Sequence, residues 1–278
     1  MRSGLKRSLS KFFIHIILLV ASVTCVFPLV WLVRSSLMNS VEMFIVPIRW
    51  IPEKVMWENY PNALTAEPFL RYFFNTILIA GLNIVGNLFC STFAAFGFTR
   101  LEFKGRDIIF SILVATMMIP STALLIPQFI GWNAAGLYNT YAPLILPAFF
   151  VNALFTFMMK QFFASIPKEY DESAIIDGAS YLRIYRSILL PLSKPAMTTV
   201  VLFTFMWTWN DFFGPLIYLK DSSKFTLALG LQMFMGRNVS QWNLLMAAST
   251  VVIIPMIVVF FIGQKAFVQG ITFSGIKG

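Results

Sequence analysis

Residues Tyr72 to Phe98 read YFFNTILIAGLNIVGNLFCSTFAAFGF, which is 27 residues without a Lys, Arg, Asp or Glu. About 20 predominantly apolar residues in a helix cross the hydrocarbon core of a bilayer. Because backbone N–H and C=O groups in hydrocarbon must be hydrogen-bonded within the segment, a run of this length is expected to be helical. Strands of a membrane barrel would be about 10 residues long with alternating polarity. The stretch therefore predicts a membrane-spanning helix.

Five further apolar runs of similar length lie before and after this one. The six predicted spans are residues 12–33, 72–98, 108–132, 138–159, 196–219 and 244–263. Charged residues make up 12% of the 278 residues, about half the share that is usual in soluble domains. This composition excludes a disordered chain, a small disulfide scaffold and an ordinary cytosolic enzyme. We predict an all-α integral membrane fold with six transmembrane helices.

The distribution of Lys and Arg predicts how these helices are oriented. An even number of spans places both termini on one side, and that side holds 14 of the 21 basic residues, against 7 on the other. Cytoplasmic loops carry the excess of Lys and Arg, so both termini are expected in the cytoplasm. The predicted divisions are the N-terminus with the first helix (1–34), an extracytoplasmic loop (35–71), the core transmembrane domain (72–267) and a cytoplasmic tail (268–278).

This asymmetry also accounts for the net charge of +9. No soluble segment interleaves basic with aromatic residues as a nucleic-acid-binding protein would. Nucleic acid is therefore not an expected partner, whereas membrane lipid is.

The cytoplasmic loop 165–195, between the fourth and fifth predicted spans, is expected to hold two short helices. Acidic residues after Pro167 suit a helix N-terminus, and Gly178 suits the position just past a helix C-terminus. A second helix is indicated by apolar residues at helical spacing, namely Tyr181, Ile184, Tyr185, Ile188, Leu189 and Leu192. By composition alone, the pair could simply connect two spans along the membrane surface.

The spacing within this loop resembles the E-A-A---G---------I-L-P loop of ABC importer permeases. The matching residues are Glu172, Ser173, Ala174, Gly178, Ile188, Leu190 and Pro191, together with Asp177 and Ala179 beside the glycine. Ser173 replaces the usual first alanine of the motif with another small residue. Similarity to the MalG-type permeases of the carbohydrate-uptake branch extends over nearly the whole chain, including Ile119-Pro120, Ile126-Pro127, residues 136–140, 209–212 and the tail from Phe267 to Gly278.

The resemblance implies a type I ABC importer permease in a bacterial or archaeal cell membrane, forming half of a translocation pathway. The expected partners are a second, similar permease chain, two ATPase subunits and an extracytoplasmic solute-binding protein. By match of position, the residues of the loop motif would contact the ATPase. The chain has no G-x-x-x-x-G-K-[ST] motif to cradle phosphates, and no catalytic or metal-binding set. ATP and Mg²⁺ are therefore expected on the partner ATPases, and this chain is expected to be non-catalytic.

Trp209, Asn210 and Asp211 are candidates for the substrate pathway. A charge deep in a span usually faces a bundle interior or a water-filled pathway, although Asp211 could instead reach water at the outer interface. Trp207 and Trp209 could stack on sugar rings, yet aromatic residues are equally expected at a membrane interface.

The leading interpretation is import of a sugar or oligosaccharide. The alternatives are an ABC permease for another polar solute, such as a glycerol-phosphate ester, and an ion-driven secondary transporter. The last would predict inverted repeats and buried carboxylates, and Asp211 alone meets that description. The sequence does not indicate which sugar is carried.

Overall fold

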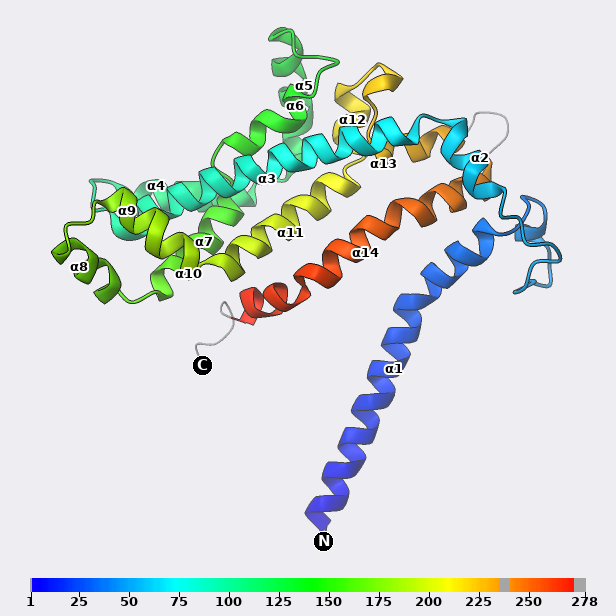
Figure 1. Ribbon diagram of the computed structural model, residues 1–278, viewed down its shortest axis with the longest axis horizontal. Helices are drawn as coiled ribbons and strands as arrows, with labels where there is room; N and C mark the ends of the chain where they lie inside the picture. Colours follow the sequence, from blue (N-terminus) through cyan, green and yellow to red (C-terminus); the bar gives the residue numbers. More distant parts are fainter. Residues whose placement is uncertain (1, 236–240, 273–278) are drawn as a thin grey trace. The chain divides into compact units, whose positions relative to one another are not determined.

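The computed structural model, which describes residues 2–235 and 241–272, is built from helices and holds no strand within those ranges (Figure 1). Side chains are described for residues 11–235 and 241–264, so most of the predicted tail, 268–278, lies outside the described residues. The α-helices are α1 (Arg2–Ser36), α2 (Asn59–Ala66), α3 (Phe69–Arg100), α4 (Arg106–Ala115), α5 (Ser121–Ala134), α6 (Ala142–Ile145), α7 (Ala153–Ser165), α8 (Glu169–Ile176), α9 (Tyr181–Ile184), α10 (Leu190–Leu192), α11 (Lys194–Asn210), α12 (Phe213–Tyr218), α13 (Leu227–Leu231) and α14 (Trp242–Thr272).

Six membrane crossings are compatible with these helices. Four segments are long and apolar enough to cross a bilayer, namely Lys11–Ser36, Phe69–Arg100, Ala142–Ser165 and Trp242–Gln264. Two bent helix pairs, Arg106–Met118 with Ser121–Ala134 and Tyr181–Leu192 with Lys194–Asn210, bring the number to six if each pair is one span. The count agrees with the sequence prediction.

The predicted third span, 108–132, is broken rather than one continuous helix. Its two halves meet at 99° because the chain leaves the helical conformation at Ile119, where ψ is 118°. Proline disfavours the α conformation in the residue before it, and Pro120 occupies the N-cap of α5. Pro127, by contrast, lies inside α5.

The limits of the fourth and fifth spans also differ from the predicted ones. The fourth span begins at Ala142 and ends at Ser165, six residues beyond the predicted end, and its helix is interrupted where the backbone is extended at Phe150 and Asn152. The predicted span 196–219 is interrupted, since α11 ends at Asn210 and the backbone is extended at Asp211. Apolar character continues through α12, so composition alone conceals this break.

The chain divides into two compact units, residues 1–68 with 231–254 and residues 69–230 with 255–278. In the first unit, the buried Asn59 side chain holds the end of α1, donating hydrogen bonds to Ser36 O at 2.9 Å and Met38 O at 2.8 Å. Asn243 at the start of α14 donates to Asn59 Oδ1 at 2.9 Å and accepts from Ser40 at 2.7 Å. The loop after α1 is thus fixed within this unit by side-chain amides.

In the second unit, α3 packs against α7 and α11. The approach of α3 to residues 146–149 is close, because a Cβ at Gly86 would lie 2.8 Å from Ala148 O. Asn83 on α3 donates to Thr208 Oγ1 on α11 at 3.2 Å. Asn83 therefore makes the kind of interhelical contact that is common between membrane helices.

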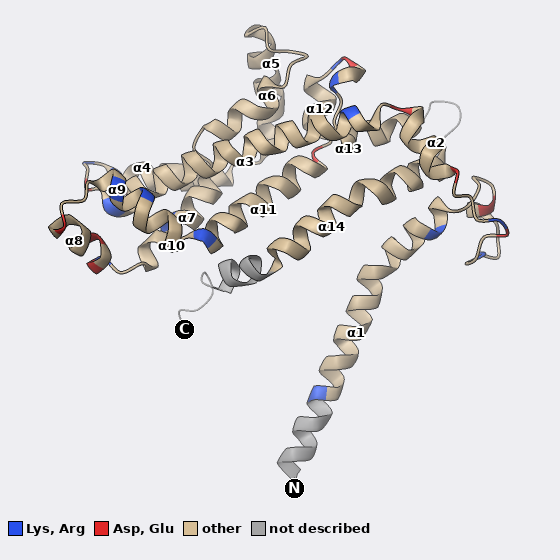
Figure 2. Ribbon diagram, viewed as in Figure 1, with Lys and Arg blue, Asp and Glu red and all other residues tan. Residues whose placement is uncertain are grey.

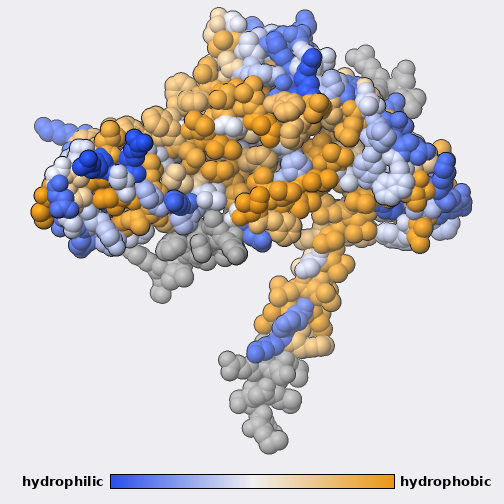
Figure 3. All heavy atoms as spheres, in the orientation of Figure 1, coloured by the Kyte–Doolittle hydropathy of each residue, from blue (hydrophilic) through white to orange (hydrophobic). Residues whose placement is uncertain are grey.

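In the second unit, charged residues lie near the ends of the long helices and apolar residues lie in the middle. Lys, Arg, Asp and Glu gather around α8 to α10 and beside α12, whereas the middle of α3 and α11 carries none (Figure 2). On the face shown in Figure 3, the surface over that middle region is predominantly apolar. An apolar middle between two charged ends is the pattern of a protein that spans a bilayer.

Candidate functional site

Helix α8 ends in a glycine turn that fixes where the chain goes next. Gly178 has φ of +79°, which is the left-handed conformation. Its N–H donates to Ile175 O at 2.9 Å, and the N–H of Ala179 donates to Ala174 O at 2.8 Å. These two bonds form a Schellman motif, which satisfies carbonyl groups that the helix leaves unpaired. The predicted role of Gly178 as the residue just past the helix is confirmed.

Most of α8 is accessible. Glu172, Ser173 and Asp177 are exposed, and 86% of Ile176 is accessible. Ala174 and Ala179 are half-buried against the core of the second unit. The helix thus presents two glutamates and two isoleucines outward.

The second predicted helix of the loop is divided into α9, a π-helical turn at Tyr185–Leu189, and α10. The apolar face predicted for it is only partly right, because Tyr181 and Leu192 are exposed, whereas Ile184, Tyr185 and Leu189 are buried and Ile188 is half-buried. A π turn inserts one residue into the helical repeat, so side chains beyond it change direction. Among the motif residues, Ile188 and Leu190 pack against the core and Pro191 is exposed.

A buried ion pair that the sequence did not suggest lies beneath α8. The guanidinium of Arg100, at the end of α3, pairs through Nε with Asp171, the one buried residue of α8. The two side chains are 5% and 13% exposed. Arg100 also donates to Ile166 O, just past α7, at 2.9 Å. The sequence pattern predicts Asp171 to be one of several acidic residues at a helix N-terminus and places Arg100 in the basic excess, and neither pattern indicates a pair.

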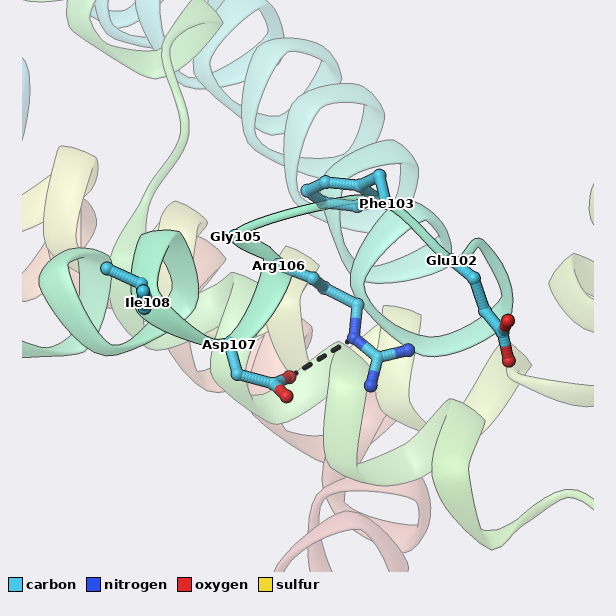
Figure 4. Close-up of a pocket in the computed structure, with 6 residues that line it drawn as sticks. All are labelled: Glu102, Phe103, Gly105, Arg106, Asp107 and Ile108. Atoms are coloured by element: carbon cyan, nitrogen blue, oxygen red, sulfur yellow. Dashed lines mark hydrogen bonds and ion pairs between the residues drawn. The ribbon is translucent and has the colours of Figure 1, made fainter.

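Two hollows lie in this region, and the ion pair lines the first of them. One, of about 140 Å³, is lined by both residues of the pair together with Lys168, Glu172 and Tyr181. The other, of about 400 Å³, is lined by the turn between α3 and α4, including Glu102 (Figure 4). The close-up also shows an exposed ion pair in that turn, between Arg106 and Asp107 at 3.1 Å. The region around α8 is therefore rich in charge and open to an approaching surface.

The predicted pathway residues lie at the break between α11 and α12. Asp211 Oδ1 accepts from the N–H of Gly214 at 3.0 Å and so caps α12, while Asn210 donates to Met206 O at 2.8 Å. Both line a hollow of about 450 Å³ together with Trp207. Trp209 does not face that hollow, being only 3% exposed and stacked on Phe205.

The two tryptophans of α11 therefore differ in what they can contact. Half of Trp207 is exposed, and its indole stacks on Phe155 with ring centroids 5.2 Å apart. Of the pair, Trp207 rather than the predicted Trp209 lines the hollow and is accessible to a ligand. The choice depends on helix rotation, which the sequence pattern alone did not fix.

Comparison with known proteins gives a consistent result. The family described as "Binding-protein-dependent transport system inner membrane component" matches residues 87–273. The arabinooligosaccharides transport system permease protein AraQ of Bacillus subtilis is 31% identical, over 94% of this chain and 93% of AraQ. The sn-glycerol-3-phosphate transport system permease protein UgpE of Rhizobium meliloti is 32% identical, over 96% of this chain and 97% of UgpE.

A solved structure shares the fold. A chain from a bacterial ABC transporter involved in the import of the acidic polysaccharide alginate superposes with a TM-score of 0.83 at 24% identity, covering 93% of this chain and 96% of that one. The overall fold of this chain is therefore one already seen in that transporter.

Proposed function

Because this chain belongs to the family of binding-protein-dependent transport system inner membrane components, we propose that it is the permease subunit of an ATP-driven importer for a sugar or oligosaccharide. It forms half of the translocation pathway, and a second, similar permease chain forms the other half. Two separate ATPase subunits bind ATP and Mg²⁺, so this chain is not itself catalytic. An extracytoplasmic solute-binding protein delivers the solute.

The observation that carries the proposal is the exposed, glycine-terminated helix α8 within the matched region. Its outward face combines the carboxylate of Glu172 with the apolar side chain of Ile176. Such a face suits a cleft with a basic group and an apolar floor, where a charge-assisted hydrogen bond is about twice as strong as a neutral one. Residues 172–174, 177–179, 188 and 190–191 form the proposed coupling segment, with Ile188 and Leu190 supporting it from beneath.

Charge reversal at Glu172 tests this coupling role. Glu172→Lys should reduce the amount of ATPase that co-purifies with the permease, because the carboxylate is replaced by a charge that repels a basic partner. Glu102→Lys is the matched control, since it makes the same charge change at an exposed residue of the α3–α4 turn. Equal ATPase recovery with both variants and with the unaltered chain would contradict the coupling role of α8.

The orientation belongs to the same proposal. With α8 facing the cytoplasm, both termini are cytoplasmic, and the segments 35–71 and 220–243 face outward to the binding protein. A reporter fused after Gly278 should then remain in the cytoplasm. Export of that reporter would require an odd number of spans and would contradict the six-helix arrangement.

The solute class is proposed from the relatives and from the hollow at the α11–α12 break. Amide and carboxylate groups beside an exposed indole suit a hydroxylated ring, which can be hydrogen-bonded at its edge and stacked on its face. Uptake of labelled oligosaccharides and of glycerol 3-phosphate by the reconstituted importer distinguishes the sugar from the glycerol-phosphate alternative, which the similarity to UgpE keeps in view. Trp207→Ala should raise the KM for transport, and the fold-increase in KM should exceed the fold-decrease in the amount of folded protein.

A further inference from the structure

Helix α8 has little apolar packing to fix its direction. Asp171 is its one buried residue, and its other side chains are exposed or half-buried. Burial of apolar surface contributes about 25 cal/mol per Å², so a helix whose inward residues are small gains little from it. Contacts of another kind must therefore hold α8 in place.

The Arg100 guanidinium is placed to make those contacts. It extends from the last residue of the 32-residue helix α3, pairs with Asp171 of α8 and donates to Ile166 O at the end of α7. A guanidinium is a planar, permanently charged group whose donors have a fixed geometry. One rigid group thus joins the ends of three helices.

Burial strengthens this joint. The attraction between opposite charges grows as the surrounding dielectric falls, and Arg100 and Asp171 are both largely shielded from water. The exposed pair Arg106 and Asp107 in the neighbouring turn, at 32% and 80% exposure, lacks that advantage. The arginines of the two pairs lie six residues apart on the chain, and the pairs differ mainly in burial and in whether they join separate helices.

We propose that Arg100 and Asp171 are positioning residues that make α8 follow the movement of α3, so that a displacement of the membrane helix reaches the ATPase-facing helix through this pair. The inference rests on the proposed function and adds the route of coupling within this chain. Rigid-body transitions in proteins proceed by movement of intact elements about such fixed interfaces. Neither residue needs to touch the ATPase or the solute.

The test uses the complete importer, reconstituted in proteoliposomes with its ATPase, its partner permease and its binding protein. The variants are Arg100→Gln, Asp171→Asn, the double variant and Arg100→Lys, with Arg106→Gln and Asp107→Asn as controls. Three quantities are measured for each: the amount of permease in the membrane, the ATPase that co-purifies with it, and the solute transported per ATP hydrolysed.

The expected result is a loss of coupling rather than of protein. Each single neutral variant should lower the solute transported per ATP by about tenfold or more, since removing one partner leaves a buried charge unpaired, while permease and ATPase amounts stay within about twofold of the unaltered complex. The double variant should lose less than the product of the two single losses, because the pair acts as a unit. Arg100→Lys keeps the charge but lacks the planar donor geometry, so it should restore only part of the ratio, and both control variants should leave it unchanged.

Three results would overturn the inference. The first is an unchanged amount of solute transported per ATP in both single variants. The second is a fall in membrane-inserted permease that parallels the fall in transport, which would indicate a role in stability alone. The third is a double variant whose loss of coupling equals the product of the two single losses. If the unaltered complex neither binds an ATPase nor transports, the proposed function fails. If it does both and the variants match it, only the positioning role fails.

Discussion

Replacement of Gly178 should strain the turn after α8 and change the direction of the chain there, and the size of the strain can be calculated. The residue has φ of +79°, and a Cβ built on it meets no heavy atom within 4 Å. The cost of a side chain there is therefore backbone strain without steric clash. For a residue other than glycine the left-handed conformation costs roughly 1–2 kcal/mol, and a β-branched residue is the least suited to it.

This strain lowers the fraction of molecules in which α8 is correctly placed. A strain of about 1–2 kcal/mol changes an equilibrium by a factor of roughly 5–30. Because α8 has little apolar packing to resist a shift, the strain should be relieved by rotation of the turn rather than by unfolding of the protein. We expect coupling to fall in the order Gly, Asn, Ala, Val at this position, since asparagine tolerates the left-handed conformation best among the replacements.

The assay is the solute transported per ATP hydrolysed by the reconstituted importer. Gly105 supplies the control, because its φ is +82° and a Cβ there would lie 4.0 Å from the Ile109 side chain. Gly105→Val carries the same strain in the α3–α4 turn, away from α8. Equal coupling in Gly178→Asn and Gly178→Val, or an equal loss in Gly105→Val, would refute the reasoning.

Two further predictions concern stability. Gly86→Ala should lower the free energy of unfolding by about 1–3 kcal/mol through overpacking, since its Cβ would lie 2.8 Å from a backbone oxygen. Gly81→Ala on the same helix, with nothing within 4 Å of its Cβ, should be neutral or stabilising by up to about 1 kcal/mol. Thermal unfolding in detergent measures both variants, and equal shifts of the unfolding temperature would contradict the prediction. The hydrogen bond from the Asn139 side chain lowers the pKa of the Asp221 carboxyl, with a smaller contribution from a nearby lysine. Because that pKa is lowered on folding, the contact stabilises the folded state at pH values above the ordinary carboxyl pKa of 3.8. This stabilisation is lost as the pH falls through the lowered pKa. Hydrogen exchange of residues 219–225, corrected for its intrinsic pH dependence, should show less protection in acid, and the same profile in Asn139→Ala would count against the assignment.

Hydrophobic run length was sufficient to predict the class of fold. Runs such as 72–98 have no soluble alternative, and the helix observed there, Phe69–Arg100, exceeds the predicted limits by only a few residues. The breaks within spans were harder to locate. Ile119-Pro120 could be predicted from proline geometry, but the break at Asp211 has no proline and depends on a side-chain cap to Gly214.

The candidate site was predictable only where it depends on local sequence. Gly178 follows from the chemistry of helix ends, so its conformation was foreseeable. The pairing of Arg100 with Asp171 joins residues 71 positions apart, and such a contact depends on tertiary packing that a single sequence does not specify. The exposure of Trp207 and burial of Trp209 likewise follow from how α11 is rotated against its neighbours.

The central claim, that α8 is the surface through which this chain engages a separate ATPase, is tested most directly by site-specific photo-crosslinking. A photoreactive residue replaces Ile176, which is 86% accessible at the end of α8, in the assembled importer. A second one replaces Leu19 on α1, which is 65% accessible and lies in a predicted span, as the control. The account predicts a covalent adduct between residue 176 and the ATPase and none from residue 19. A transporting complex in which residue 176 forms no adduct with the ATPase would contradict it.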